Sequence, residues 1–265
     1  MSYKPSPSKK NFMIKINNPE LLTKLPNAIL FDTDNTLYSY NEANEAAISA
    51  VRKKTKQMLS ISSSEFDEAY DNARSSVKSM LGSTASSHSR LLYIQRMLEH
   101  MGLGSQVLLS LDFEQTYWRS FLANATLFNG VKELLDDIRI AGIPTAIVTD
   151  LTAQIQFRKI IYFGLDSYFD HIVTSEETGA DKPNESMFKL SLEKMKPEGT
   201  CFWMIGDNPI SDIKGSRESI GAITFQKIHD DLKEGSGEYT PDVVFKDFFS
   251  LRDIFQKVLN NEKPR

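Results

Sequence analysis

Two aspartates separated by one residue, Asp32 and Asp34, are the part of this sequence best suited to chemistry. They follow a short apolar run from Ala28 to Phe31, which predicts a buried strand. Because side chains alternate along an extended chain, both carboxylates point to the same side. They could share a metal and a substrate, one as nucleophile and the other as proton donor and acceptor. The alternative is a polar turn that closes the strand.

A second and a third stretch offer groups that bind anions. Thr149 and Asp150 supply a hydroxyl and backbone N–H groups at a loop that leads into a helix, which suits an oxyanion. Lys182 lies just before another helix, where its compact ammonium group can neutralise phosphate charge. Each has a plainer interpretation, since Thr149 and Asp150 could cap a helix and most lysines lie on the surface.

A fourth stretch, 206–212, adds carboxylates after another apolar run. With Asp32, Asp207 would supply hard oxygen ligands of the kind that Mg²⁺ prefers, together with several waters. Asp207 and Asp212 could instead form a turn and a helix cap. The occurrence of all four stretches at successive strand ends favours an active site over unrelated turns.

The remaining chain predicts how these groups are positioned. From 41 to 125 apolar residues recur at helical spacing, which indicates about four helices inserted after the first strand. After 125 strands alternate with helices, which indicates right-handed crossovers and a mainly parallel sheet. We therefore expect an α/β fold with an N-terminal extension at 1–27, a core domain formed by 28–40 and 126–265, and an inserted four-helix domain at 41–125.

The core elements can be placed from the same patterns. Strands are expected at 28–31, 144–149, 171–174, 201–205, 222–225 and 242–245, and helices at 130–141, 154–163, 185–194, 210–220 and 251–259. In the extension, 11–16 is a candidate edge strand and 19–25 a candidate helical turn.

The composition excludes several classes of protein. The chain has 265 residues and a net charge of −4, which argues against a nucleic-acid partner. No apolar run is long enough to span a bilayer, and the first 15 residues lack the apolar core and cleavage site of a signal peptide. The single cysteine, Cys201, excludes an internal disulfide and a thiolate zinc cluster. We expect a cytoplasmic protein that binds no membrane.

The four stretches together resemble the motifs of the haloacid dehalogenase-like (HAD) hydrolases, over residues 28–259. The matching residues are Asp32-Thr33-Asp34-Asn35-Thr36, Thr149, Lys182-Pro183, and Gly206-Asp207 with Asp212. The resemblance implies a Rossmann-like core with the first strand at its centre and a helical lid of the first cap type at 41–125. The sequence Asp34-Asn35-Thr36-Leu37-Tyr38 is similar to that of the pyrimidine 5′-nucleotidase branch of the family. At Asn35 the commonest family motif has glycine.

The resemblance also implies a role for each residue. Asp32 would be the nucleophile and a metal ligand, and Asp34 the general acid and base, its backbone carbonyl also on the metal. Thr149, Asp150 and Lys182 would bind the substrate phosphate. Asp207 would ligate Mg²⁺, while Asp212 and Asn208 would support the metal or the lysine without touching the phosphate.

The implied function is a Mg²⁺-dependent phosphomonoesterase that hydrolyses a nucleoside 5′-monophosphate or a sugar phosphate through an aspartyl-phosphate intermediate. A hydrolytic 2-haloacid dehalogenase is one alternative, although the dehalogenases of this family lack the second acid. Another is a phospho-accepting signalling domain, but such domains carry no helical lid. The last alternative is a binding module with an inactive catalytic site, but every residue with a role in the family motifs is present in the sequence.

The helical block predicts where the substrate is selected. Arg90 is our candidate for substrate contact, because it begins a helix beside the polar residues His88 and Ser89. The alternative is an ordinary solvated arginine. The pattern leaves the identity of the phosphorylated substrate and the oligomeric state open.

Overall fold

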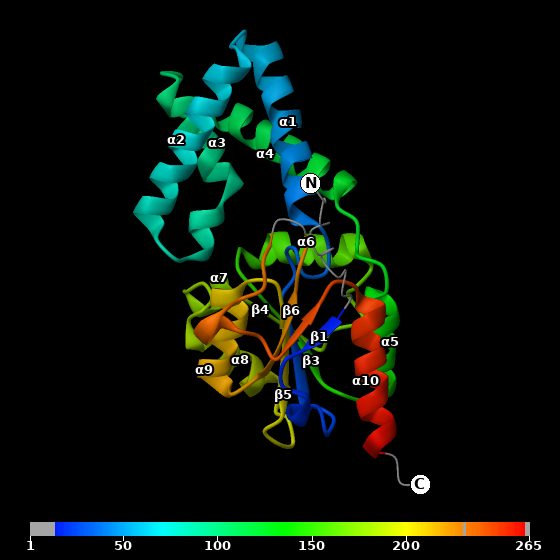
Figure 1. Cartoon of the computed structure of the whole chain (residues 1–265). Coiled ribbons are helices and arrows are strands. Elements are labelled where there is room, and N and C mark those ends of the chain that lie inside the picture. The colour runs from blue at the N-terminus through cyan, green and yellow to red at the C-terminus, as the bar shows by residue number, and fades with distance from the viewer. Residues whose placement is uncertain (1–13, 230–231, 263–265) are drawn as a thin grey trace, which may run out of the picture.

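A seven-stranded sheet forms the centre of the computed structural model, which describes residues 14–229 and 232–262 (Figure 1). The strands are β1 (Ile14–Ile16), β2 (Ala28–Phe31), β3 (Thr145–Thr149), β4 (His171–Thr174), β5 (Phe202–Gly206), β6 (Ile223–Lys227) and β7 (Val243–Phe245). Their order is β1-β7-β6-β5-β2-β3-β4, and only β1 runs antiparallel to its neighbour. β2 is fully buried between β3 and β5, which confirms the predicted Rossmann-like architecture.

Helices cover both faces of this sheet. In Figure 1, α5 (Val131–Ile140) and α10 (Phe248–Glu262) lie on one side, and α8 (Glu185–Met195) and α9 (Gly215–Ile220) on the other. Alternate residues of β2 belong to different cores, Ile29 and Phe31 on one face and Ala28 and Leu30 on the other. A strand buried on both faces must be apolar throughout, which explains the uninterrupted run that precedes Asp32.

Four helices form a separate unit beyond the carboxyl ends of the strands (Figure 1). They are α1 (Tyr40–Leu59), α2 (Ser63–Leu81), α3 (Arg90–His100) and α4 (Val107–Asn124), and we call them the cap. Local sequence supports them: Ser62 and Glu65 form a capping box at the start of α2. Phe66, Phe113 and Tyr117 pack into the apolar core. The inserted four-helix cap is thus confirmed, while the exact domain boundaries at 27/28, 40/41 and 125/126 stay a prediction.

Some elements differ from their predictions in length or type. The candidate edge strand at 11–16 is observed as β1, with residues 11–13 outside the described part, and the turn at 19–25 contains a short 3-10 helix, Pro19–Leu21. The helix predicted at 210–220 begins as a π-helix, Pro209–Lys214, and continues as α9. The four-residue helix α7 (Ser175–Thr178) was not predicted, because its one turn is too short to show periodicity. Within the described ranges, no helix combines the length and the apolar character needed to cross a membrane.

Candidate active site

Asp32 lies directly after β2, at the carboxyl edge of the sheet, where open α/β folds bind ligands. Its Oδ1 accepts a hydrogen bond from Lys182 Nζ at 2.7 Å, and its Oδ2 accepts one from Thr36 Oγ1 at 2.8 Å. Burial raises the pKa of Asp32 to about 6, with Lys182 opposing the rise and Asp212 adding to it. The two hydrogen bonds therefore fix the orientation of the Asp32 carboxylate. Its raised pKa means that Lys182 alone does not balance the effects of burial and of the neighbouring acids.

Lys182 is a buried cation in contact with Asp32. Its Nζ lies 2.7 Å from Asp32 Oδ1 and 2.7 Å from Asp212 Oδ1. Burial alone would lower the pKa of Lys182, but Asp212 and Asp32 outweigh it and hold that pKa well above its usual range. The backbone N–H of Lys182 donates to Asp150 Oδ1 at 2.9 Å. The Asp150 carboxylate thus fixes the segment that carries the lysine, a contact that the sequence did not indicate.

Two further carboxylates converge beside Asp32. Asp32, Asp207 and Asp212 each offer one oxygen, and these oxygens lie within 4.8 Å of one another. Burial, followed by the charges of Asp32 and Asp212, raises the pKa of Asp207 well above its usual range. A Cβ on Gly206 would lie 2.5 Å from the Asp212 side chain, so only glycine permits this close approach. The cluster needs a compact positive charge, and an all-oxygen donor set fits Mg²⁺.

Asn208 holds the loop that carries two of these acids. Its side-chain oxygen accepts the backbone N–H groups of Ile210 and Ser211, each at 2.9 Å, which caps the π-helix. Its own backbone N–H donates to Asp212 Oδ2 at 3.0 Å. π-Helical turns often occur at functional sites, and this one turns Asp212 back toward the strand end.

Among the residues that the structure describes, Asp34 and Asp32 share no hydrogen-bond partner. Its two carboxylate oxygens accept hydrogen bonds from Lys159 Nζ at 2.9 and 3.1 Å, and the Tyr38 hydroxyl also donates to it. Burial raises the pKa of Asp34, but Lys159 and Tyr38 outweigh this and leave the pKa below its usual value. The ammonium group of Lys159 lies among the rings of Tyr38, Tyr40, Trp118 and Phe121.

Lys159 was not among the predicted site residues, although the sequence carries a signal for it. It belongs to α6 (Ala153–Phe163), and the spacing Ile155, Lys159, Phe163 places it on the apolar face of that helix. A lysine on such a face needs a carboxylate partner.

Thr149 ends β3 beside the central strand. Its hydroxyl lies 2.9 Å from the Thr33 hydroxyl and accepts a hydrogen bond from Gln156 Nε2 at 2.8 Å. From the sequence, Thr33 was named only as part of the first motif, and Gln156 was not among the predicted site residues. They fix the Thr149 hydroxyl at the edge of the sheet.

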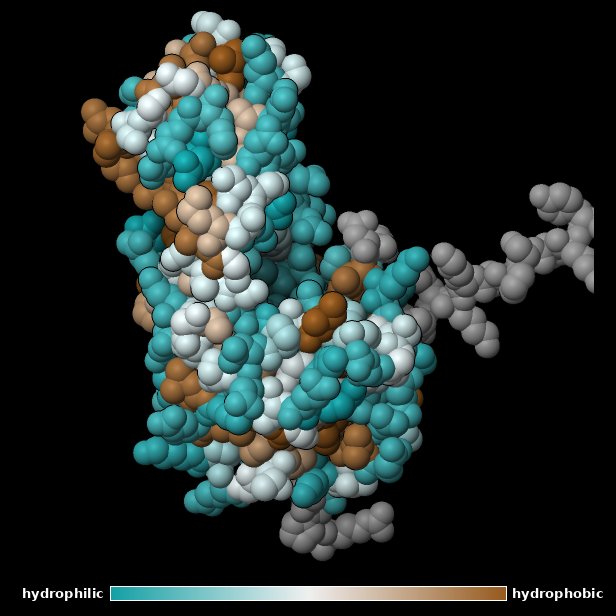
Figure 2. Space-filling model, turned by 90° about the vertical axis from the view of Figure 1, so that its left-hand side faces the viewer, coloured by the Kyte–Doolittle hydropathy of each residue, from teal (hydrophilic) through white to brown (hydrophobic). Residues whose placement is uncertain are grey.

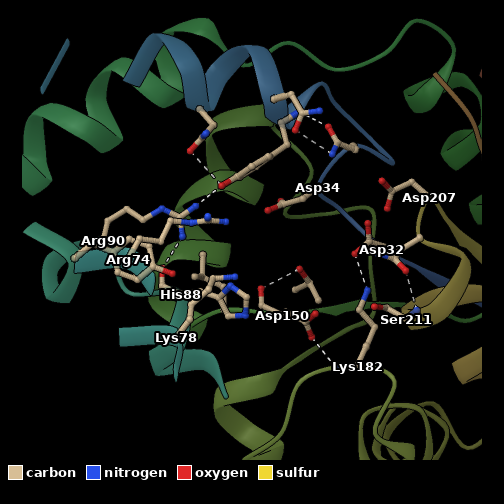
Figure 3. Close-up of a pocket in the computed structure, with 18 of the residues that line it drawn as sticks. Asp32, Asp34, Arg74, Lys78, His88, Arg90, Asp150, Lys182, Asp207 and Ser211 are labelled. Atoms are coloured by element: carbon tan, nitrogen blue, oxygen red, sulfur yellow. Dashed lines mark hydrogen bonds and ion pairs between the residues drawn. The ribbon is translucent and has the colours of Figure 1, made fainter. Parts of the chain in front are cut away.

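A cavity of about 540 Å³ joins the core to the cap. It is lined by every residue predicted for the site: Asp32, Asp34, Arg90, Thr149, Asp150, Lys182, Asp207, Asn208 and Asp212. In Figure 3 the acids and Lys182 lie on one side of this space and basic cap residues on the other. Figure 2 shows the hollow between cap and core, with mainly hydrophilic residues around it.

Arg90 is buried in the wall of this cavity, with a relative exposure of 8%. Its guanidinium group donates to the Tyr40 hydroxyl and, at 2.6 Å, to the His88 carbonyl. The group also lies over the ring of Tyr117, 5.3 Å from its centroid. The alternative of an ordinary solvated arginine is therefore wrong.

The cap touches the core close to Lys182. His88 Nε2 lies 3.0 Å from Asp181 Oδ2, and the backbone N–H of Asp181 donates to the Ser83 carbonyl at 3.0 Å. The segment 83–88 of the cap thus contacts the residue immediately before the buried lysine.

Comparison with known proteins defines the class. Residues 26–219 match the family model described as haloacid dehalogenase-like hydrolase. The chain is 37% identical to the ribulose-1,5-bisphosphate 5-phosphatase of Halopiger xanaduensis over 71% of this chain and 80% of the relative. It is 27% identical to the glyceraldehyde 3-phosphate phosphatase of Methanocaldococcus jannaschii over 87% of this chain and 97% of the relative.

The fold is similar to the crystal structure of 2-haloacid dehalogenase from Pseudomonas syringae pv. tomato. The TM-score is 0.69, with 18% identity over 88% of this chain and 99% of the other. The protein belongs to the haloacid dehalogenase-like hydrolases, as the family model and the first relative show. The predictions of this family and of a HAD-type phosphatase, a phosphoric monoester hydrolase, are confirmed. The nucleotidase branch stays a prediction.

Proposed function

We propose that this protein is a Mg²⁺-dependent phosphatase of small sugar phosphates that works through an aspartyl phosphate on Asp32. The observation that carries the proposal is the arrangement around one cavity: Asp32 is held by Lys182 and Thr36, while Asp34 belongs to a different network. One acid is thereby oriented for attack, and the other is kept separate for proton transfer.

The reaction would proceed in two displacements. An Asp32 carboxylate oxygen attacks phosphorus, the bond from phosphorus to the ester oxygen breaks, and Asp34 gives a proton to the leaving oxygen. Asp34 then takes a proton from the water that attacks phosphorus, which releases phosphate and restores Asp32. Lys182 and the hydroxyl of Thr149 would hold the phosphoryl oxygens, since both lie beside Asp32 at the sheet edge.

Asp32, Asp207 and the backbone carbonyl of Asp34 would hold Mg²⁺. The raised pKa of Asp207 and the gathering of three carboxylates support a divalent cation at this place. When bound, the ion offsets the negative charge of the acids and of the transferring phosphoryl group. Asp212 would fix Lys182 and the loop rather than bind the metal, because its two oxygens accept from Lys182 Nζ and from the backbone N–H of Asn208.

The relatives favour a sugar phosphate as the substrate. Those described above are named for ribulose-1,5-bisphosphate and glyceraldehyde 3-phosphate, both small phosphorylated sugars. Nucleoside 5′-monophosphates are the other class to test, since the motif around Asp34 also resembles nucleotidases.

Phosphate release from a panel of sugar phosphates and nucleoside monophosphates, with Mg²⁺ or with excess chelator, tests the proposal. We expect turnover of a sugar phosphate with Mg²⁺, loss of turnover with chelator, and recovery when Mg²⁺ is restored. Asp207→Asn should raise the Mg²⁺ concentration for half-maximal rate by about tenfold or more, because a charged ligand is lost. Full turnover in chelator, or nucleotides as the better substrates, would contradict the proposal.

A further inference from the structure

The cap wall of the cavity carries three basic residues that the proposed chemistry does not use. Arg74 and Lys78 lie one helical turn apart on α2, which places them on the same side of that helix. Arg90 begins α3 beside them. In Figure 3 these side chains lie together, across the cavity from Asp32 and Lys182.

These cations are in direct contact with no carboxylate in the part of the chain that the structure describes, although Asp181 acts on Lys78 from a longer distance. No Asp or Glu of residues 14–229 and 232–262 forms an ion pair with Arg74, Lys78 or Arg90. Asp71 also lines the cap wall, but it forms no ion pair with Arg74, one turn away. Partial burial, followed by the charges of Arg74 and Arg90, lowers the pKa of Lys78. The wall therefore holds an excess of positive charge.

Arg90 makes the strongest case for an anion. Its side chain is buried, yet the groups that it contacts are neutral: the Tyr40 hydroxyl, the His88 carbonyl and aromatic rings. The charge of Arg90 helps to lower the pKa of Asp34, but Asp34 is hydrogen-bonded to Lys159 and not to Arg90. A buried charge in contact with neutral groups only is costly, and a guanidinium group prefers charged acceptors such as phosphate, which it can bind through two hydrogen bonds. The burial increases from Arg74, which is exposed, through Lys78 to Arg90, so the charge lines a path into the cavity.

We propose that Arg74, Lys78 and Arg90 form a second phosphate-binding site, and that the substrate is a small sugar with a phosphate at each end. This inference rests on the proposed function: one phosphate lies at Asp32 and Lys182 and is hydrolysed, while the other binds the cap wall and is retained. A single cavity connects the site of Asp32 and Lys182 to the basic residues of the cap, so one molecule could place a phosphate at each end of it. A monophosphate would leave the cap cations unsatisfied.

Binding of alkyl phosphonates, which cannot be hydrolysed, tests the second site separately from catalysis. A series of linear bisphosphonates of increasing length is titrated calorimetrically into the full-length protein with Mg²⁺, beside monophosphonates and phosphonocarboxylates of matched length. We expect the best bisphosphonate to bind at least about tenfold more tightly than its monophosphonate, as one added charged contact implies. This advantage, the affinity for the bisphosphonate divided by that for the monophosphonate, should fall by about tenfold in Arg90→Gln and in Lys78→Met.

Lys78→Met keeps the test valid if loss of the buried Arg90 impairs folding, because Lys78 is only partly buried. Lys53→Met, on the exposed surface of α1, is the matched control and should keep the full advantage. Equal binding of mono- and bisphosphonates, or an advantage unchanged in Lys78→Met, would overturn the second site. Tighter binding of phosphonocarboxylates would overturn a phosphate as its ligand. Absence of turnover with preserved bisphosphonate selectivity would instead refute the proposed function alone.

Discussion

Lys159 donates hydrogen bonds to both carboxylate oxygens of Asp34, whereas Lys182 donates to Asp32. Each of the two central acids thus has a buried lysine of its own. Lys182 orients the acid that attacks phosphorus in our proposal, and Lys159 positions the acid that moves protons. The aromatic rings of the cap around Lys159 couple this arrangement to the cap helices.

Replacing Lys159 by methionine should impair proton transfer more than attack. A sugar alkoxide leaves only when protonated, whereas 4-nitrophenolate leaves without help, so the loss should depend on the leaving group. A well-placed acid and base contribute about 10²–10⁴-fold, and we expect Lys159→Met to lose about tenfold in kcat for the sugar phosphate. The loss for 4-nitrophenyl phosphate should be smaller. Arg158→Met, which removes the exposed neighbouring cation, is the control and should leave kcat for both substrates unchanged. Equal losses of kcat for both substrates in Lys159→Met would refute a positioning role for Lys159.

The contact between His88 and Asp181 should hold the cap segment 83–88 against the core. Partly exposed pairs contribute about 0.2–1 kcal/mol, so His88→Ala should accelerate hydrogen exchange of this segment by up to about fivefold. Exchange in β2 should stay unchanged. His100→Ala, at the exposed end of α3, is the control. If exchange at 83–88 were the same in both variants, the contact would not restrain the cap.

Asp242 should stabilise the sheet edge in a pH-dependent way. Its carboxylate accepts from the Thr224 backbone N–H at 2.7 Å and from Asn18 Nδ2 at 2.7 Å. Burial raises its pKa, but these hydrogen bonds outweigh burial and lower it from the ordinary 3.8. A carboxyl whose pKa is lower when folded stabilises above the unfolded pKa, and the effect is lost as the pH falls through the folded pKa.

Asp242→Asn should therefore cost about 2 kcal/mol of unfolding free energy at neutral pH, measured by urea denaturation. The difference from the natural protein should shrink as the pH falls below 3.8. Asp253→Asn, on the exposed surface of α10, should show no such cost. A difference that stayed constant down to acid pH would mean that the charge of Asp242 does not stabilise the fold.

The core of the fold was predictable because its signals are local. The apolar run before Asp32 must be buried on both faces, and acids that end such runs meet at one edge of a parallel sheet. The departure from the family motif at Asn35 also has a local explanation. The backbone φ of Asn35 is 60°, a value that asparagine adopts more readily than most residues, so asparagine can replace the glycine of the family motif there.

The parts that escaped prediction depend on contacts between distant segments. The place of Lys159 on an apolar helix face indicates that it needs a carboxylate, but Asp34 is 125 positions away, and nothing near either residue indicates which acid is the partner. The cap wall could not be predicted either, because the sequence around Arg74 and Lys78 is that of an ordinary amphipathic helix with exposed cations. Only the folded structure shows that both residues line the cavity. The π-helix at Pro209–Lys214 could not be told from an ordinary helix start by periodicity.

Separate roles for Asp32 and Asp34 are the central claim, and trapping of the intermediate tests it most directly. Asp32→Asn should abolish turnover, because a neutral amide cannot form the acyl phosphate. Asp34→Asn should still be phosphorylated by 4-nitrophenyl phosphate, but its dephosphorylation should slow by about 10²–10⁴-fold, since no base activates the water.

Mass spectrometry of the acid-quenched Asp34→Asn protein, after reaction with 4-nitrophenyl phosphate and Mg²⁺, is the decisive measurement. We predict a burst of about one nitrophenolate per site and a phosphate on Asp32, as covalent catalysis requires. Phosphate on any other residue, or turnover of Asp34→Asn at the rate of the natural protein, would contradict the assignment of the two acids.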